Sequence, residues 1–291
     1  MDASASGRRI AATGMFDGVH LGHRHLLRAL AAEAEKRGLT PLALTFAEHP
    51  LATLRPECAP AILTSQSLKK ELIGKAGIDE CVIMPFGKED FALTAAHFIE
   101  RIQSNYGVDV LLMGFNNHIG SDRRTAAELA AAGLPVVCAD EYPGLSVSSS
   151  QVREAVGKAD FAKVQALSGH RFTVRGTVGG GLHLGRTIGF PTANITPEDP
   201  RQLLPPDGVY AVDVHLGAAT FRGMANIGMR PTVAGTGRTF EVNIIGFNGD
   251  IYGERADIDF ISRLRDERRF ESLDALAAQL AADRTAAIAA E

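Results

Sequence analysis

The stretch Thr13–His25, TGMFDGVHLGHRH, decides the fold of the first half of the chain. An apolar run, Ile10–Ala12, leads into it, and an amphipathic helical pattern follows at Leu26–Ala31. A strand that turns through glycines into a helix directs backbone N–H groups and the positive end of the helix at one point. His20 and His23, three residues apart, are expected on the same side of the first turn of that helix. Together these groups suit a triphosphate that is attacked at its α-phosphorus.

The histidine pair gains meaning from the residues around it. The spacing His-x-Gly-His resembles the signature of the nucleotidylyltransferase superfamily, and the run Gly14–His23 resembles its FAD synthetase branch. Glycines in such a turn permit positive φ angles and a close approach of the backbone to a ligand. A solvated histidine pair or half of a metal site is the alternative interpretation. The resemblance implies that His20 and His23 stabilise phosphates. The other residues expected to bind nucleotide in this run are Gly14, Phe16, Asp17, Gly18 and Gly22.

Composition restricts the class of protein. A chain of 291 residues with 45% hydrophobic and 22% charged residues is typical of a globular protein of about two domains. A formal net charge of −4 gives no general attraction to nucleic acid. The three widely spaced cysteines indicate neither a zinc site nor a disulfide framework, and no apolar run is long enough to cross a membrane. We expect a cytoplasmic protein that acts on small molecules, as a monomer or weak homo-oligomer, without nucleic-acid or membrane partners.

The first half of the chain alternates between strand and helix patterns. Expected strands are 10–12, 41–46, 80–85, 108–114 and 134–139, and expected helices are 23–37, 65–76, 92–106 and 125–132. Such alternation predicts an α/β fold, a doubly wound parallel sheet of the Rossmann-like type with helices on both faces. Ligands of these sheets bind beyond the carboxyl ends of the strands, where the glycine–histidine turn lies. We expect this domain to span residues 1–168, with a polar helical segment at 151–167.

The pattern changes near Gly169. Short strands broken by glycine are expected at 172–178, 208–216, 220–227, 240–247 and 256–261, and one helix at 272–290 follows them. Several short strands at regular intervals predict a small antiparallel β-barrel, against which the terminal helix packs. The second domain is therefore expected to span residues 169–291.

Two further motifs belong to the first half. Asn116 follows an apolar strand and could offer its amide to an adenine or ribose edge, although a surface turn is the alternative. The FAD synthetase family has an aromatic residue in this segment where the chain has Ile119. Serines before a helix bind phosphate oxygens through hydroxyl and N–H groups, and a nearby arginine adds a bidentate cation. The block resembles the family motif Ser-Ser-Thr-x-x-Arg, with serine in place of threonine. It implies that the leaving pyrophosphate is held by Ser148, Ser149, Ser150 and Arg153.

The motif Gly185–Asn194, GRTIGFPTAN, dominates the second half. Thr192 and Asn194 are expected to point the same way on an extended segment, where a hydroxyl and an amide oxygen suit Mg²⁺ beside phosphate oxygens. Glycine loops, such as the one upstream at 176–181, can wrap a triphosphate with main-chain N–H groups. The motif resembles the riboflavin kinase signature at every defined position. The residues expected at the nucleotide are Gly176, Gly179, Gly185, Arg186, Gly189 and Pro191.

Later segments extend this second resemblance. The run 226–232, NIGMRPT, resembles a riboflavin kinase motif that contains Asn226 and Arg230. Glu241 stands at the position of that family's general base, where a carboxylate accepts the proton of an alcohol that attacks the γ-phosphate. Arg265 is expected near the flavin, with a charged helix start as the alternative interpretation.

The combined resemblance implies a bifunctional riboflavin kinase/FAD synthetase of the prokaryotic type. Such enzymes convert riboflavin and ATP to FMN, and then FMN and a second ATP to FAD, with Mg²⁺ as cofactor. Three alternatives stay open: another adenylyltransferase of the same N-terminal fold, a riboflavin kinase with a degenerate first half, and a flavin-binding carrier without turnover. The barrel motif argues against the first. A base beside two candidate metal ligands, Glu241 with Thr192 and Asn194, argues against the third.

Overall fold

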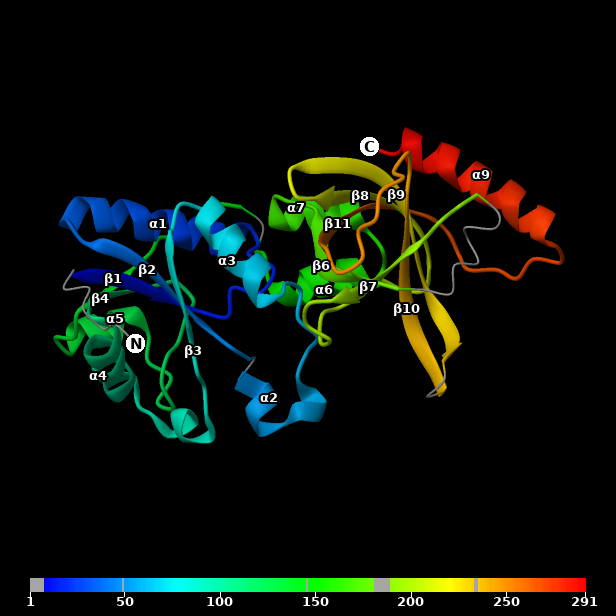
Figure 1. Cartoon of the computed structure of the whole chain (residues 1–291). Coiled ribbons are helices and arrows are strands. Elements are labelled where there is room, and N and C mark those ends of the chain that lie inside the picture. Colours follow the sequence, from blue (N-terminus) through cyan, green and yellow to red (C-terminus); the bar gives the residue numbers. More distant parts are fainter. Residues whose placement is uncertain (1–7, 49, 145, 181–188, 233–234) are drawn as a thin grey trace. The chain divides into compact units, whose positions relative to one another are not determined.

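The computed structural model describes residues 8–48, 50–144, 146–180, 189–232 and 235–291 (Figure 1). Its contacts divide the chain into two compact units. The first unit comprises Met1–Pro60 and Gln66–Ser148, and the second comprises Ala61–Ser65 and Ser149–Glu291. Each unit has its own sheet.

Five parallel strands form the sheet of the first unit, in the order β3-β2-β1-β4-β5. They are β1 (Arg9–Thr13), β2 (Thr40–Phe46), β3 (Glu80–Met84), β4 (Val108–Met113) and β5 (Val136–Cys138). The central strand β1 pairs with both β2 and β4. The strand order reverses there, and in doubly wound sheets ligands bind outside the carboxyl ends of the strands at this point. The expected parallel sheet is confirmed.

Helices cover both faces of this sheet (Figure 1). They are α1 (Leu21–Arg37), α3 (Gln66–Lys75), α4 (Ala95–Tyr106) and α5 (Ala126–Ala131). Alternate residues of β1 point to opposite faces, so Ile10 packs with α1 and α3, whereas Ala11 packs with α4 and α5. A short helix, α2 (Pro50–Leu54), and two 3₁₀ turns, η1 (Pro56–Cys58) and η2 (Lys88–Ala92), were not expected from the sequence.

Six antiparallel strands close the barrel of the second unit, in the order β10-β7-β6-β11-β8-β9. They are β6 (Phe172–Gly179), β7 (Ala193–Pro197), β8 (Gly208–Leu216), β9 (Ala219–Thr232), β10 (Gly235–Ile244) and β11 (Arg255–Arg265). Rings from opposite sides of the barrel meet inside it, with the centroids of Phe240 and Phe260 5.8 Å apart. The barrel is confirmed, although β7 was not expected as a separate strand.

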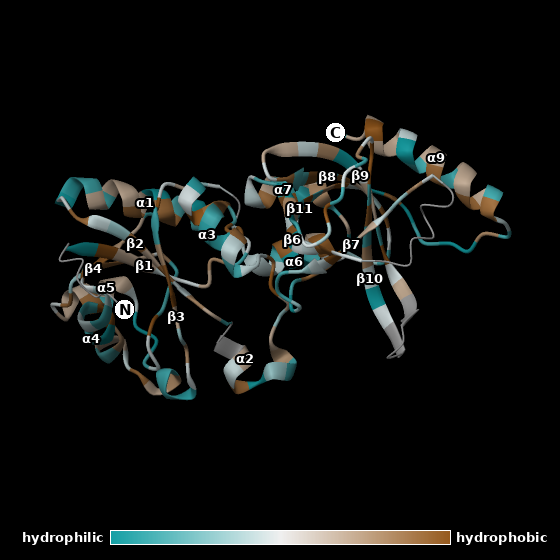
Figure 2. Ribbon diagram, in the orientation of Figure 1, coloured by the Kyte–Doolittle hydropathy of each residue, from teal (hydrophilic) through white to brown (hydrophobic). Residues whose placement is uncertain are grey.

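The terminal helix α9 (Leu273–Ala289) packs on the outside of the barrel. Its buried residue Ala287 contacts an apolar cluster that includes Ala211 and Met224. Figure 2 shows hydrophobic and hydrophilic residues mixed along α9. The expected terminal helix is therefore confirmed.

The segment expected as one polar helix forms two, α6 (Ser149–Gly157) and α7 (Phe161–Ser168). Ala159 lies between them with a positive φ of 54°, which ends the first helix. The Phe161 ring stacks on Phe260 of the barrel, with centroids 5.3 Å apart. Because of such contacts, α6 and α7 belong to the same compact unit as the barrel. The functional boundary after residue 168 stays a prediction.

Candidate active sites

The glycine–histidine turn places two imidazole rings at the N-terminus of α1. His20 is the N-cap residue, and its Nδ1 accepts a hydrogen bond of 3.3 Å from the backbone N–H of His23. The two rings stack with centroids 3.6 Å apart, and the Phe16 ring meets His23 edge-on. Asp17, in the same turn, is buried, and no acidic residue lies in the first turn of α1. The structure thus brings the two predicted histidines together at the positive end of a helix.

Other residues of the turn differ from expectation. Phe16 is fully buried, so its ring supports His23 and cannot reach a ligand from outside. Of the glycines at 14, 18 and 22, only Gly18 needs a positive φ, at 77°. Gly14 instead lines a cavity, described below.

The pKa of His23 lies well below its ordinary value. Burial is the largest cause, followed by repulsion from His20 and from Lys69. The Nδ1 atom of His23 is buried and has no hydrogen-bond partner among the residues that the structure describes. His23 is therefore neutral at pH 7 and can donate or accept a hydrogen bond.

The lowered pKa of His23 makes stability depend on pH. In the unfolded chain His23 binds a proton near its ordinary pKa of 6.5, whereas folded His23 does not. Stability is therefore expected to fall as the pH drops below 6.5, by at most about 1.4 kcal/mol per pH unit, until the folded pKa is reached. Thermal unfolding at about pH 7.5 and about pH 5.5 should show a larger loss for the wild type than for His23→Phe. Equal losses would contradict this assignment.

A cavity of about 580 Å³ opens at the carboxyl ends of the sheet strands, beside Gly14. Four phenylalanine rings line it, Phe98 among them, and the other three are in edge-to-face contact, with centroid distances of 5.2 and 4.8 Å. They are Phe46, Phe86 and Phe91. Asn116, expected to face the nucleotide, does not line this cavity, whereas the adjacent Asn117 does. Such a cavity suits a flat aromatic ring.

The serine–arginine block is divided between the two units. Ser148 belongs to the first unit, and Ser149, Ser150 and Arg153 belong to the second. The Arg153 Nε–H donates to the carbonyl oxygen of Ala61 at 2.7 Å. Ala61 belongs to the short segment Ala61–Ser65, which groups with the second unit. Helix α6 begins at Ser149, two residues before the expected start at 151, so Ser149 and Ser150 lie in its first turn. Phosphate binding by these residues stays a prediction.

A second constellation lies on the outer face of the barrel. Glu241 in β10 stands directly opposite Asn194 in β7 and opposite Asn226 in β9. Opposite residues of antiparallel strands share a face, so these polar residues form one row across three strands. Glu241 is only 7% exposed. Its neighbours Phe240 and Val242 point into the barrel. We call Asn194, Glu241 and Asn226 the outer row.

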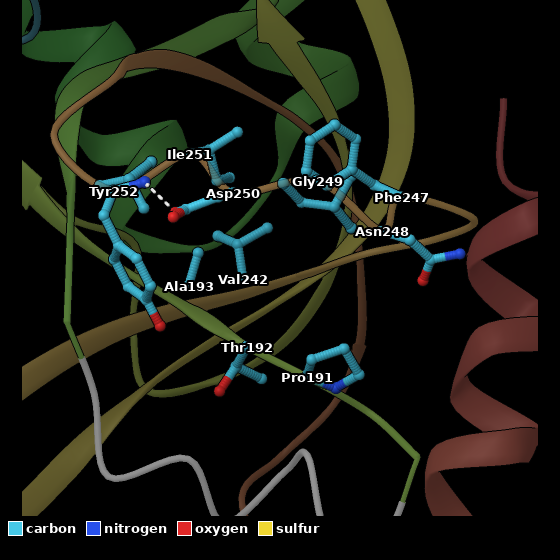
Figure 3. A pocket seen from close by; sticks show the side chains of 12 residues that line it. Pro191, Thr192, Ala193, Val242, Phe247, Asn248, Gly249, Asp250, Ile251 and Tyr252 are labelled. Atoms are coloured by element: carbon cyan, nitrogen blue, oxygen red, sulfur yellow. Dashed lines mark hydrogen bonds between the residues drawn. The ribbon is translucent and has the colours of Figure 1, made fainter.

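A cavity of about 650 Å³ adjoins the segment before Asn194. Figure 3 shows Pro191 and Thr192 on one side of this cavity and the loop 247–252 on the other. The Asn243 side-chain amide donates to the carbonyl oxygen of Pro191 at 2.7 Å, which fixes this segment on β10. Thr192 thus lines the cavity, whereas Asn194 and Glu241 do not.

The glycines of the barrel that are expected at the nucleotide occupy different backbone positions. Gly176 lies inside β6, where an added Cβ would be 2.5 Å from the carbonyl oxygen of Thr196, so glycine is needed for strand packing and not for phosphate. Gly179 ends β6 opposite Asn194, and Gly189 has a positive φ of 81° just before the Phe-Pro-Thr-Ala-Asn run. Arg230 lies on β9. Outside the described residues lie Gly185 and Arg186.

Comparison with known proteins decides between the alternatives. Residues 168–290 match the family model of riboflavin kinase, and residues 2–137 match that of FAD synthetase. A bifunctional riboflavin kinase/FMN adenylyltransferase of Escherichia coli strain K12 is 38% identical, over 93% of this chain and 88% of its own length. The chain belongs to the bifunctional riboflavin kinase/FMN adenylyltransferase family. Because both domains are present, the bifunctional enzyme is favoured over a kinase with a degenerate first half.

Other members of this family also match this chain over most of its length. The proteins of the same description from Pseudomonas fluorescens and Bacillus subtilis strain 168 are 38% and 30% identical, over 96% and 97% of this chain and 91% and 92% of their own lengths. A solved structure titled as a macrolide-efflux protein from Streptococcus pneumoniae matches with a TM-score of 0.86 and 32% identity, covering 98% of this chain and 95% of that chain. In the described part of this chain, no helix has the length and apolar character needed to span a membrane.

Arg265 has a structural partner where flavin contact was expected. Its guanidinium donates to the Asp283 carboxylate of α9, with Nε–Oδ1 and Nη2–Oδ2 distances of 3.0 and 2.7 Å. Asp283 is almost completely buried. Arg265 ends β11 and a loop follows it, so the alternative of a charged helix start is wrong, whereas flavin contact stays a prediction. Arg265 therefore anchors α9 to the barrel.

Replacing Arg265 by methionine is expected to destabilise the kinase unit. The change leaves the Asp283 carboxylate buried without its cation, which costs about 3–5 kcal/mol in comparable pairs. Arg269→Met, at an exposed position of the following loop, is the matched control. Thermal unfolding should show a lower transition temperature for the first variant only. An unchanged transition together with a weaker affinity for riboflavin would restore the flavin-contact interpretation.

Glu267 joins the outer row although sequence reasoning did not select it. The Asn226 side-chain amide donates to Glu267 Oε1 at 3.0 Å. Gly228 permits this approach, because an added Cβ would lie 2.0 Å from the Glu267 carboxylate. The available signal was the glycine two residues after Asn226, which implies that something packs closely on β9.

Proposed function

We propose that the two activities of the family use two separate sites, each with its own ATP. FMN formation takes place at the outer row of the barrel, and FAD formation takes place at the glycine–histidine turn. The observation that carries the proposal is the register of β7, β10 and β9. This register sets an acidic residue, Glu241, opposite Asn194 in one unit. In the other unit the stacked His20–His23 pair lies at the N-terminus of a helix that His20 caps.

At the outer row, Glu241 acts as the general base for riboflavin. Its carboxylate accepts the proton of the ribityl 5′-hydroxyl as that oxygen attacks the γ-phosphorus of ATP. The new bond joins the ribityl oxygen to phosphorus, the bond to the β-phosphate oxygen breaks, and ADP leaves. Burial of Glu241 excludes bulk water, which would otherwise compete for the phosphoryl group.

At the glycine–histidine turn, the FMN phosphate is itself the nucleophile. Its oxygen attacks the α-phosphorus of ATP, the bond to the β-phosphate oxygen breaks, and pyrophosphate leaves. The chain therefore positions the reactants and stabilises charge. His20, His23 and the N-terminus of α1 face the phosphates. The resemblance to the family motif assigns the pyrophosphate to Ser148–Ser150 and Arg153. The phenylalanine-lined cavity beside Gly14 supplies the stacking surface for a planar ring of a substrate.

The residues of the barrel fit Mg²⁺. Thr192 offers a hydroxyl oxygen, and Asn194 offers its amide oxygen because its Nδ2 donates to the carbonyl oxygen of Gly180 at 3.3 Å. Mg²⁺ prefers oxygen ligands and typically takes one or two from protein and the others from phosphates and water. Within the described ranges, no group of three or more His, Cys, Asp or Glu side chains could hold a metal. When bound, Mg²⁺ neutralises charge on the transferred phosphate.

The setting of the enzyme follows from the same proposal. Its substrates, ATP, riboflavin and FMN, are small anionic or polar molecules of the cytoplasm, where we place the chain. We infer a monomer or weak homo-oligomer without nucleic-acid partners, consistent with the net charge of −4.

Product analysis tests the proposed function. The purified protein is incubated with riboflavin, ATP and Mg²⁺, and flavins are separated by chromatography. The proposal predicts that FMN appears first and FAD follows. FMN without FAD would select a kinase alone, and neither product would select a carrier.

A further inference from the structure

Three asparagine side chains lie around Glu241 on the outer face of the barrel. Asn194 and Asn226 stand opposite Glu241 on the neighbouring strands, and Asn243 follows on the same face, two residues along β10. Each amide nitrogen donates to an oxygen that can only accept a hydrogen bond. In the order Asn194, Asn226 and Asn243, these oxygens are the carbonyl oxygen of Gly180 at 3.3 Å, Glu267 Oε1 at 3.0 Å and the carbonyl oxygen of Pro191 at 2.7 Å.

These hydrogen bonds fix which end of each amide meets a ligand. An amide group donates through its nitrogen and accepts through its oxygen, so a partner that only accepts must face the nitrogen. Within the described part of the chain, no group donates a hydrogen bond to any of the three amide oxygens. The outer row therefore presents an amide oxygen on each side of the Glu241 carboxylate. Oxygen atoms in this arrangement suit a ligand that donates several hydrogen bonds, such as a chain of hydroxyl groups.

The order of the outer row assigns its two ends to different substrates. The proposed Mg²⁺ ligands, Thr192 and Asn194, are at the β7 end, so the phosphates of ATP lie on that side of Glu241. In phosphoryl transfer the attacking oxygen and the leaving oxygen lie roughly in line, on opposite sides of the phosphorus atom. The alcohol therefore approaches from the β9 end, where Asn226 stands opposite Glu241.

We propose that Asn226 binds a secondary hydroxyl group of the ribityl chain and that Glu267 is a positioning residue that orients the Asn226 amide. This inference rests on the proposed function of the barrel. The Asn226 side-chain oxygen accepts a hydrogen bond from one hydroxyl group while Glu241 takes the proton of the terminal hydroxyl group. Neighbouring strands are about 4.8 Å apart, a distance that hydroxyl groups of one short polyol chain can span. The kinase site thereby recognises a polyhydroxylated chain rather than any primary alcohol.

The loop that carries Glu267 is fixed on helix α9. The Arg268 guanidinium donates to the side-chain oxygen of Gln279 in α9 and lies over the Phe270 ring, 4.8 Å from its centroid. These contacts hold the loop on both sides of Glu267, because Arg265 pairs with Asp283 of the same helix. A partner held in advance lowers the entropic cost of orienting the amide when the substrate binds.

The test pairs riboflavin with an analogue whose ring carries a 5-hydroxypentyl chain, which keeps the terminal hydroxyl group and lacks the secondary ones. Asn226→Leu is expected to lose about 10–10²-fold in kcat/KM with riboflavin and nothing with the analogue, because the amide serves only a secondary hydroxyl group. Glu271→Gln, in the same loop as Glu267, is the matched control and should match the wild type with both substrates. If the analogue is phosphorylated too slowly to measure, its inhibition constant against riboflavin gives the same comparison.

An exchange of the two partners tests the positioning role of Glu267. Asn226→Asp alone sets two carboxylates against each other and should lower the rate with riboflavin. Combined with Glu267→Gln, it restores a hydrogen bond in the opposite direction and leaves an oxygen of residue 226 for the hydroxyl group. The double variant is therefore expected to recover most of the rate that Asn226→Asp loses. No recovery in the double variant would remove Glu267 from the proposal.

FAD formation from added FMN and thermal unfolding report whether each variant is intact. Equal losses with riboflavin and the analogue would overturn the proposal, as would a wild-type rate of Asn226→Leu with riboflavin. A raised Mg²⁺ requirement of Asn226→Leu, with an unchanged preference for riboflavin over the analogue, would also overturn it and assign the amide oxygen to a cation. Failure of the proposed function gives a different result, because Glu241→Gln would then phosphorylate riboflavin at the wild-type rate.

Discussion

Glu241→Gln is expected to slow FMN formation by about 10²–10⁴-fold while FAD formation from added FMN proceeds at the wild-type rate. The amide has nearly the same size as the carboxylate but cannot accept the hydroxyl proton. Its effect is confined to the barrel, because Glu241 lies in the outer row of the second unit. The two rates are measured on one preparation, with riboflavin and with FMN as alternative substrates.

The control for this variant is Glu271→Gln. Glu271 is exposed in the loop before α9, and the same loss of one negative charge there should leave both rates unchanged. An equal fall of both rates in Glu241→Gln would show that the sites are not separate. Full kinase activity in that variant would remove Glu241 from the reaction.

His23→Ala is expected to give the opposite pattern, with FAD formation lowered by about 10²–10³-fold and FMN formation unchanged. The variant loses the ring that stacks on His20 and the buried Nδ1 that is available to a phosphate. It keeps the His20 cap of α1, because the hydrogen bond from residue 23 to His20 comes from the backbone N–H. Initial rates of pyrophosphate release from FMN and ATP measure the effect.

His25→Ala is the matched control for His23→Ala. His25 lies on the same helix, but its Nε2 is 3.1 Å from the carbonyl oxygen of Asp140 and its ring contacts Tyr142. Removing it should leave FAD formation near the wild-type rate. If His25→Ala were as damaging as His23→Ala, the defect would belong to the helix and not to the phosphate-binding ring.

The fold could be predicted where hydrophobic periodicity is strong. The strands of the first sheet and helix α1 follow the expected pattern because their buried residues recur at regular spacing. The short strand β7 was missed because it begins within the Pro-Thr-Ala-Asn segment, where motif residues replace a clear alternation. The grouping of α6 and α7 with the barrel could not be predicted from local patterns. It depends on the contact between the rings of Phe161 and Phe260, two residues that are far apart in the sequence.

The candidate sites were predictable only where residues act within one motif. His20 and His23 meet through local helix geometry, and the motif analysis placed both. Glu267 was missed because it reaches the outer row from another element, through a contact that no local spacing reveals. Phe16, Gly176 and Arg265 are expected at ligands, and the structure adds contacts that their motifs do not reveal: ring packing for Phe16, strand packing for Gly176 and an ion pair for Arg265.

The most direct test of two separate ATP sites mixes the two single variants. Glu241→Gln and His23→Ala are each incubated with riboflavin, ATP and Mg²⁺, alone and then together, and FAD is measured by chromatography. We predict that neither variant alone makes FAD from riboflavin, and that the mixture does, because FMN released by one is adenylylated by the other. A mixture that forms no FAD, or a single variant that forms it at the wild-type rate, would contradict the account.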